Sequence, residues 1–183
     1  MSEIPSHETH LRNAERNAPQ DPVRCAVMTV SDTRTPDTDQ GGPLIVSLLE
    51  KAKCEIVDRQ IVPDEASAIG SQLDQWISNP DIHVILTTGG TGISRRDITV
   101  DIVRARLSVE LPGFGELFRL LSYEQVKASA MLSRAVAGLV IRPLAEGGET
   151  FIFTLPGSIN AVETAMTDLI VPQLAHLIWE RRK

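Results

Sequence analysis

Apolar and polar positions follow two different periods along the first half of the chain. Short apolar runs predict buried strands of a parallel sheet at Arg24–Val30, Glu55–Val62 and Ile82–Thr87. Between them, apolar residues recur at helical spacing after Pro43 and over Ala66–Ile77. Strands and helices therefore alternate, and right-handed crossovers of this kind place helices on both faces of a sheet.

The second half of the chain predicts a change from parallel to antiparallel pairing. Two strands, Gly138–Ile141 and Phe151–Leu155, are joined through a glycine-rich turn at Glu146–Glu149, which is typical of a hairpin. Ser158 is positioned to cap the next helix, and Pro172 is expected to break or restart that helix. The predicted fold is a three-layer α/β/α arrangement with a mostly parallel sheet and an antiparallel hairpin.

Composition changes this picture only at the amino end. Residues 1–22 are polar and charged without either period, so we expect a flexible tail there and one domain over residues 23–183. With 42% hydrophobic residues, a chain of 183 residues can bury one sizeable core. Cys25 and Cys54 form no C-x-x-C pair, and the four histidines are scattered, so no histidine metal site is expected.

Charge and hydropathy exclude two classes of partner. The net charge of −6, with no basic patch beyond the last three residues, disfavours nucleic-acid binding. No apolar run approaches the roughly 18 residues needed to cross a bilayer. The amino-terminal segment also lacks the apolar core of a secretory signal. We expect a cytoplasmic protein without a membrane segment, whose partners are small molecules or proteins.

A glycine-rich turn directly follows the strand at Ile82–Thr87. Its glycines can adopt positive φ, so that backbone N–H groups converge on an anion. Arg95, Arg96 and Asp97 lie on the rim, and two arginines with a carboxylate suit a phosphate together with a divalent cation. The turn has neither the Walker nor the dinucleotide spacing, so a purely structural turn is the alternative. Thr99 is the expected N-cap of the following helix. The turn consists of Thr88, Gly89, Gly90, Thr91 and Gly92.

Polar residues also follow the other predicted parallel strands. Ser31 and Asp32 come directly after the first strand, and Asp64 follows the second. Because the carboxyl ends of parallel strands meet at one edge of a sheet, we expect these side chains near the glycine turn. Simple turn chemistry, or a helix N-cap in the case of Asp64, is the alternative interpretation.

Six motifs in order resemble the molybdenum cofactor biosynthesis protein B and molybdopterin adenylyltransferase family. The resemblance runs from about Arg24 to Trp179 and implies a molybdopterin-binding α/β fold that assembles as trimers, sometimes paired into hexamers. The motifs are T-V-S-D at 29–32, P-D-E at 63–65, T-T-G-G-T-G with R-R-D at 87–97, P-G-F-G-E at 112–116, S-R-A at 133–135 and L-P-G-S at 155–158.

The resemblance also implies a reaction and a site. In relatives that are adenylyltransferases, the terminal phosphate of molybdopterin attacks the α-phosphate of ATP, and Mg²⁺ is required. Carried over by position, Asp64 and Asp97 are the implied catalytic acids, with Asp97 as the implied Mg²⁺ ligand. The implied substrate-binding residues are Ser31, Asp32, Thr88, Gly89, Gly90, Thr91, Gly92, Arg96, Gly113, Glu116, Ser133, Arg134, Pro156, Gly157 and Ser158.

The resemblance leaves two functions open. Some members of the B branch are thought not to adenylylate, and they depart at the P-D-E and R-R-D motifs. This chain keeps both motifs, which favours the enzyme. The alternative is a non-catalytic molybdopterin-binding or scaffolding protein of the same pathway, and the resemblance also allows a partner protein that inserts molybdate. The visible departure is a longer hairpin near Ala145–Glu149, at a loop.

A cluster of aromatic and aliphatic residues offers a surface for subunit contact. Phe114, Leu117 and Phe118 lie close together in the sequence, in a segment with two glycines. We expect them to contribute to an interface between copies of the chain. The alternative is that they fill the core of the monomer.

Overall fold

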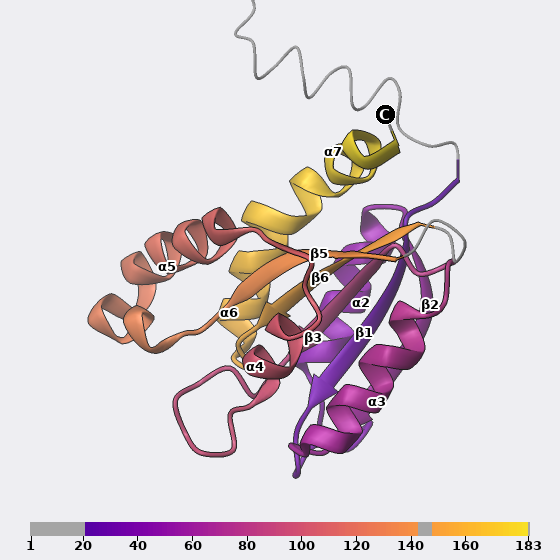
Figure 1. The fold of residues 1–183 in the computed structure, drawn as a ribbon. Helices are drawn as coiled ribbons and strands as arrows, with labels where there is room; N and C mark the ends of the chain where they lie inside the picture. The colour runs from indigo at the N-terminus through magenta and orange to yellow at the C-terminus, as the bar shows by residue number, and fades with distance from the viewer. Residues whose placement is uncertain (1–20, 143–147, 183) are drawn as a thin grey trace, which may run out of the picture.

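A six-stranded sheet lies between two layers of helices in the computed structural model, which describes residues 21–142 and 148–182 (Figure 1). The strand order is β2-β1-β3-β6-β5-β4. The elements are β1 (Arg24–Val30), α2 (Gly41–Lys51), β2 (Glu55–Val62), α3 (Ala66–Ile77), β3 (Val84–Thr88), α4 (Thr99–Arg104), β4 (Val109–Glu110), α5 (Pro112–Val126), η1 (Lys127–Leu132), β5 (Val136–Ile141), β6 (Glu149–Leu155), α6 (Ile159–Thr164), η3 (Ala165–Ile170) and α7 (Val171–Arg182).

Pairing in the sheet is parallel on one side and antiparallel on the other. Strands β2, β1, β3 and β6 run parallel, β5 is antiparallel to β6, and β4 is antiparallel to β5. This confirms the mostly parallel sheet with an antiparallel hairpin in the second half. The predicted turn of that hairpin lies largely outside the described residues.

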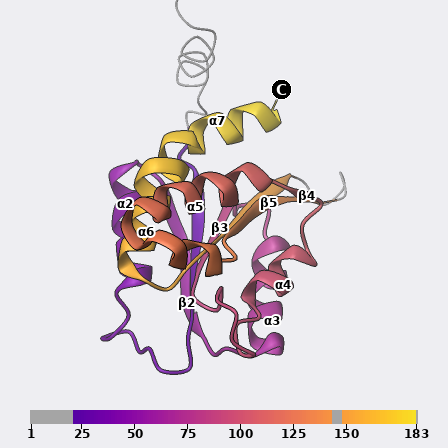
Figure 2. The same cartoon turned by 90° about the vertical axis from the view of Figure 1, so that its left-hand side faces the viewer.

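Alternating side chains of the strands face two different helix layers. Leu86 and Phe153, adjacent in register, belong to the core beneath α2, α5, α6 and α7. Their neighbours Ile85 and Ile152 belong to the core beneath α3 and α4. Figure 2 shows the two helix layers on opposite sides of the sheet. Burial on both faces explains why these strands are continuous apolar runs.

The predicted strands and helices agree closely with the observed ones in the first half. The strands at 24–30 and 55–62 and the helix at 66–77 have the predicted bounds. The central strand begins two residues later than predicted, at Val84, and extends to Thr88. Pro43 lies in the first turn of α2, where its missing N–H leaves no intrahelical bond unmade.

Two predicted helix caps are wrong in position, and a third is right in position but makes no capping bond. Glu65, not Asp64, occupies the N-cap position of α3, and Ile98, not Thr99, occupies that of α4. Ser158 does occupy the N-cap position of α6, but its side chain makes no capping hydrogen bond. The Asp64 and Thr99 side chains instead lie against Gly90, because tertiary packing outweighs the local capping preference.

The second half contains features that the pattern did not predict. The short strand β4 and the 3₁₀-helix η1 were not predicted, and β5 begins at Val136 rather than Gly138. Pro172 is the second residue of α7, directly after a π-helical segment at Ala165–Ile170. A new helix therefore starts beside Pro172, as predicted; the π-helical segment before it was not predicted.

The expected subunit surface is partly wrong. Phe114 and Phe118 are buried in the core of the monomer, where the Phe114 ring packs edge-on against Phe153 with centroids 5.4 Å apart. Leu117 is 51% exposed and remains available at the surface. In the part of the chain that the structure describes, no helix is long and apolar enough to span a membrane.

Candidate functional site

The carboxyl ends of β1 and β3 diverge at a topological switch point. The chain leaves β1 towards β2 on one side, whereas β3 lies on the other side of β1. Open α/β sheets bind their ligands in the crevice at such a point. A cleft of about 100 Å³ lies there, below the roughly 300–1,000 Å³ of a pocket for a drug-sized ligand, so it suits one group the size of a phosphate. Its lining includes Ser31, Arg34, Gln40, Thr88, Gly89 and Gly157.

The glycine-rich turn at residues 88–92, which we call the cradle, requires glycine at two of its positions. Gly89 and Gly90 have φ values of 102° and 63°, in the region that favours glycine. A Cβ on Gly89 would lie 2.3 Å from the Val30 carbonyl oxygen, and one on Gly90 would lie 2.1 Å from Thr99 Oγ1. The cradle is therefore packed against the end of β1 and the start of α4, and the turn is more than a local bend.

Two hydrogen bonds connect the cradle to the end of β6. The Gly89 N–H donates to the Leu155 carbonyl oxygen at 3.1 Å. Thr88 Oγ1 donates to the Pro156 carbonyl oxygen at 2.9 Å. Both Thr88 and Thr91 are buried. Of the predicted turn residues, Gly89 thus lines the cleft, while the Thr88 side chain ties the turn to the end of β6.

Asp32 and Asp64 meet at the same edge, as expected from the strand order. The Asp64 N–H donates to Asp32 Oδ1 at 3.0 Å, and Arg96 Nη1 lies 3.3 Å from Asp32 Oδ2. A Cβ on Gly90 would be 3.3 Å from Asp64 Oδ1, so this carboxylate borders the cradle. Burial and the nearby charges of Asp32 and Asp97 raise the pKa of Asp64, and Arg96 only partly opposes them.

The Asp97 side chain stabilises the loop that follows the cradle by a hydrogen bond within that loop. Its Oδ2 accepts the Ser94 N–H at 2.8 Å and would lie 2.8 Å from a Cβ on Gly92. Arg134 holds this loop from the other side: its Nε donates to the Gly92 carbonyl oxygen at 2.8 Å and its guanidinium also contacts the Asp97 carbonyl oxygen. Its Nη1 pairs with Asp101 at 2.9 Å. Arg134 thus fixes the relative position of cradle and acid.

Most of the remaining predicted residues line two cavities next to Arg134 and Ser133. Glu116, Ser133 and Arg134 border a cavity of about 310 Å³ between α5 and the start of β5. Pro156 and Ser158 border another, of about 170 Å³, together with Ser133. Ser133 Oγ is buried without a hydrogen-bond partner among the described residues. Gly113 lies exposed with open space around it, away from the acids.

Two charged residues at this edge, Asp39 and Arg59, were not singled out from the sequence. With Thr29 they form a largely buried network beside the switch-point cleft. Thr99, expected only as an N-cap, packs on Gly90 with its Oγ1 unpartnered in the described part of the chain. The Gly41-Gly42 pair was the available signal for the first of these. It was interpreted only as a helix start, although the structure places the network against it.

The acids at this edge fit a divalent cation that shares phosphate ligands. In the described residues, no three carboxylate, histidine or cysteine side chains are grouped closely enough to hold a metal by themselves. Mg²⁺ is commonly held by one or two carboxylates together with substrate phosphates. Asp64 beside Gly90 and Asp97 beside Gly92 place two carboxylates at the glycine turn, which is the number that such a shared site uses.

Fold and cleft together are those of an α/β protein with a candidate small-molecule site at the carboxyl edge of the sheet. The sequence profile of a family described as a probable molybdopterin binding domain matches residues 26–176. Molybdenum cofactor biosynthesis protein B of Staphylococcus carnosus is 53% identical over 164 residues, covering 88% of this chain and 92% of that protein. The chain therefore belongs to the molybdopterin-binding family that contains the molybdenum cofactor biosynthesis B proteins.

Solved structures support the same assignment. A crystal structure of molybdenum cofactor biosynthesis protein B superposes with a TM-score of 0.82 at 42% identity, covering 90% of this chain and 98% of that one. The tungsten cofactor synthesizing protein MoaB from Pyrococcus furiosus superposes with a TM-score of 0.76 at 36% identity, covering 91% and 100%. The three-layer fold is thus shared along almost the whole length of both relatives.

Proposed function

We propose that this protein acts in molybdenum cofactor biosynthesis by binding molybdopterin at the carboxyl edge of the sheet and adenylylating it with Mg-ATP. Family membership supports the pterin ligand. The observation that carries the transfer reaction is the position of Asp64, half-buried beside Gly90 and within the electrostatic reach of two further acids. Like charges gathered at one edge of a sheet are unfavourable for folding and are typical of functional sites.

The proposed reaction exchanges one phosphoanhydride for another. The terminal phosphate oxygen of molybdopterin attacks the α-phosphorus of ATP, a new P–O bond forms, and the bond to the β-phosphate oxygen breaks. Adenylylated molybdopterin and pyrophosphate are the products. Transfer of this kind is catalysed mainly by positioning and by neutralising spread negative charge.

Residues of this chain supply both contributions. The N–H groups of Gly90, Thr91 and Gly92 can cradle a phosphate, and Arg96, exposed on the rim, can bind a second anionic oxygen. Asp64 and Asp97 would hold Mg²⁺, which supplies charge neutralisation when bound among phosphates. Arg134 fixes the Asp97 loop against the cradle, so that the acids keep their spacing when the ligand binds.

One contact favours a binding protein without catalysis. The Asp97 carboxylate already accepts the Ser94 N–H at 2.8 Å, as an ordinary turn acid does. If this is its only role, the chain binds molybdopterin and delivers it to a separate transferase. Family membership alone is compatible with both functions.

Pyrophosphate release separates the two functions. Purified protein is mixed anaerobically with molybdopterin and Mg-ATP, and pyrophosphate is measured over time. We expect release that requires molybdopterin and Mg²⁺ and that is lost in Asp64→Asn. Molybdopterin binding without pyrophosphate release in the wild type would contradict the transferase and leave the scaffolding function.

We also propose that the chain assembles as a homotrimer or a homohexamer in the cytoplasm. The family resemblance is the basis for the number of subunits. Large apolar side chains exposed along α5 and η1 supply a surface for the contact. These residues are Leu117, Leu120, Tyr123, Val126, Met131 and Leu132.

A further inference from the structure

The loop between β1 and α2 forms one wall of the switch-point cleft. β1 ends at Val30 and α2 begins at Gly41, and the residues between them contribute Ser31, Arg34 and Gln40 to the lining. The opposite wall comes from β3 and from the residues after β6. Whatever fixes this loop therefore also fixes the shape of the cleft.

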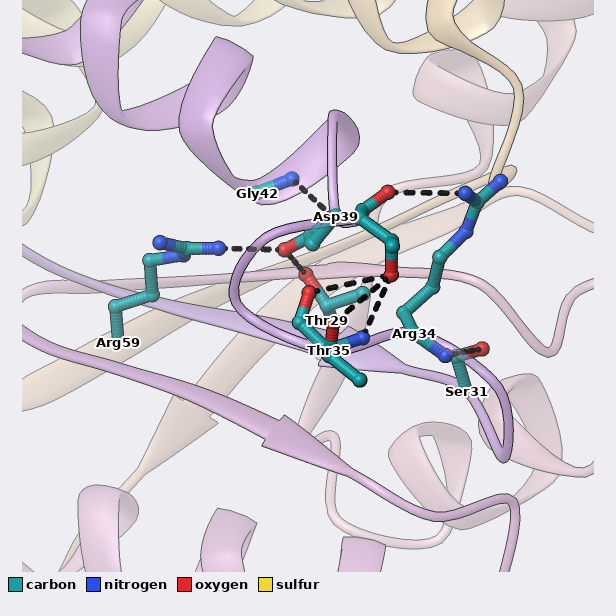
Figure 3. A network of polar contacts seen from close by, with 8 residues as sticks. Thr29, Ser31, Arg34, Thr35, Asp39, Gly42 and Arg59 are labelled. Carbon is teal, nitrogen blue, oxygen red and sulfur yellow. Dashed lines mark hydrogen bonds and ion pairs between the residues drawn. The ribbon is translucent and has the colours of Figure 1, made fainter.

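Asp39 anchors the inner end of the loop (Figure 3). Its Oδ2 accepts hydrogen bonds from Thr29 Oγ1 at 2.8 Å and Arg59 Nη2 at 2.7 Å, and its Oδ1 accepts the Gly42 N–H at 3.2 Å. The residue is only 7% exposed. Burial by itself would raise the pKa of Asp39, but the hydrogen bonds from Arg59, Thr29 and Gly42 outweigh it and lower the pKa.

Gly42 is required by this anchor. A Cβ at this position would lie 2.5 Å from Asp39 Oδ2, 2.7 Å from Thr29 Oγ1 and 2.9 Å from Arg59 Nε. No other residue type leaves room for the carboxylate. The anchor therefore combines β1, β2 and the start of α2, so the loop end is tied to three elements of the fold.

The anchor continues along the loop to Arg34. The Asp39 N–H donates to the Thr35 carbonyl oxygen at 2.9 Å, and Arg34 Nη1 donates to the carbonyl oxygen of Thr38 at 2.9 Å. The Arg34 N–H donates to Ser31 Oγ at 3.2 Å. No carboxylate in the described part of the chain forms an ion pair with Arg34. Its guanidinium thus has donors left for an anion, and a planar guanidinium suits a phosphate.

We propose that Asp39 is a positioning residue that holds the loop of residues 31–40 so that the Arg34 guanidinium faces the switch-point cleft and binds a phosphate group of the substrate. The inference rests on the proposed function. The phosphate belongs either to the nucleotide or to the pterin, which share this chemistry. Asp39 touches no ligand itself and acts through the loop.

Direct binding measurements test this role. Dissociation constants for Mg-ATP and for molybdopterin are measured separately by anaerobic calorimetry for wild type, Asp39→Asn and Arg34→Gln, with Asp37→Asn as the matched control. Asp37 lies exposed in the same loop and loses the same charge. We expect each of the first two variants to weaken one ligand about tenfold, and the control to stay within twofold. Weaker binding of Mg-ATP would assign the phosphate to the nucleotide, and weaker binding of molybdopterin would assign it to the pterin.

A double mutant separates positioning from general destabilisation. If Asp39 acts through Arg34, the Asp39→Asn/Arg34→Gln protein binds no more weakly than the weaker single variant. KM for the same ligand should rise about tenfold, with a smaller change in kcat. Independent effects that multiply, unchanged binding in Asp39→Asn, or an equal loss in the control would overturn the proposal.

A substitute variant and the behaviour of the wild type cover the cases in which Asp39→Asn does not fold or no transfer is observed. If Asp39→Asn fails to fold, Thr29→Val removes one bond to the same carboxylate and should weaken the same ligand about threefold; no weakening would overturn the proposal. Wild-type protein that binds neither Mg-ATP nor molybdopterin would overturn this inference and the proposed function together. Wild-type protein that binds them without releasing pyrophosphate, with the expected variant effects, supports the positioning role and overturns only the transfer reaction.

Discussion

At the scale of single residues, Asp64 has the most informative environment. Burial, Asp32 and Asp97 all raise its pKa, so the folded protein disfavours the charge that the proposed reaction uses. Because native Asp64 retains its proton to a higher pH than in the unfolded chain, its contribution to stability is present at low pH and is lost as pH rises through the folded pKa. The ionised carboxylate that the proposed reaction needs therefore lowers the stability of the folded protein.

Asp64→Asn should separate these two effects. We expect a melting temperature at pH 7 no lower than that of the wild type, because the variant removes a repelled charge, together with a loss of adenylyl transfer of about 10²-fold or more. The difference in melting temperature should shrink as pH falls below the ordinary range for aspartate. Calorimetric scans at several pH values check this, and a clearly lowered melting temperature at pH 7 would make Asp64 a structural residue.

The same shift predicts the pH dependence of the reaction. An ionised Asp64 is needed to hold the cation, so kcat/KM should fall as pH is lowered through the raised pKa of Asp64. The pH profile of kcat/KM for the wild type measures the pH at which this decrease occurs. A profile that stays flat down to the ordinary pKa of an aspartate would contradict the assigned role.

Asp97→Asn tests the second acid. The amide can still accept the Ser94 N–H, so the turn should persist, but the negative charge that holds a cation among phosphates is lost. We expect adenylyl transfer to fall about 10²-fold or more while molybdopterin binding is largely kept. Asp37→Asn serves as the control for charge. Turnover within about threefold of the wild type, under 1 kcal/mol, would show that Asp97 has only a structural role.

At the scale of elements, the cradle depends on backbone conformations that other residues rarely adopt. Gly89→Ala would place a methyl group 2.3 Å from the Val30 carbonyl oxygen at a φ of 102°. We expect a loss of unfolding free energy of about 1–3 kcal/mol, because the ends of β1 and β3 must separate. Denaturant unfolding measures this loss.

Gly113→Ala is the matched control for that substitution. Gly113 lies in the first turn of α5 with nothing within 4 Å of the added methyl group. Alanine should leave stability unchanged or raise it by up to about 1 kcal/mol, because it favours the helix. Equal losses in both variants would show that glycine content, rather than the packed cradle, determines the effect.

At the scale of the whole molecule, the exposed apolar side chains of α5 and η1 bear on assembly. Met131 is 76% exposed and Leu120 is 63% exposed, on a helix and turn that project from the sheet in Figure 1. Exposed apolar groups gathered in this way mark interaction surfaces. Phe114 and Phe118 do not belong to this surface, since they pack into the core of the monomer.

Light scattering should report an assembly rather than a single chain. Three copies of the 20.0 kDa chain give a mass of roughly 60 kDa, and six give twice that mass. Leu120→Glu should lower the measured mass, because a charge at a buried contact is costly. Glu124→Ala, an exposed substitution on the same helix, is the control. A wild-type mass of about 20 kDa at micromolar concentration would contradict the proposal.

The layers, the strand polarity and the edge of the sheet that carries the acids follow from the pattern of apolar and polar residues along the chain. Val27, Leu86 and Phe153 lie on strands buried on both faces, and such strands are visible as apolar runs. Because parallel strands share an edge, the positions of Asp32 and Asp64 directly after two of these strands were sufficient to bring them together.

Packing between elements, in contrast, sets which local preference each polar side chain follows. Asp64 and Thr99 are good caps by residue type, yet both lie against Gly90. Asp39 is an ordinary loop acid in the sequence, but it anchors the wall of the cleft through Arg59, twenty residues further along the chain. Hydrogen bonds between elements have no period in the sequence, so they appear only when the strands are in register and the helices are packed.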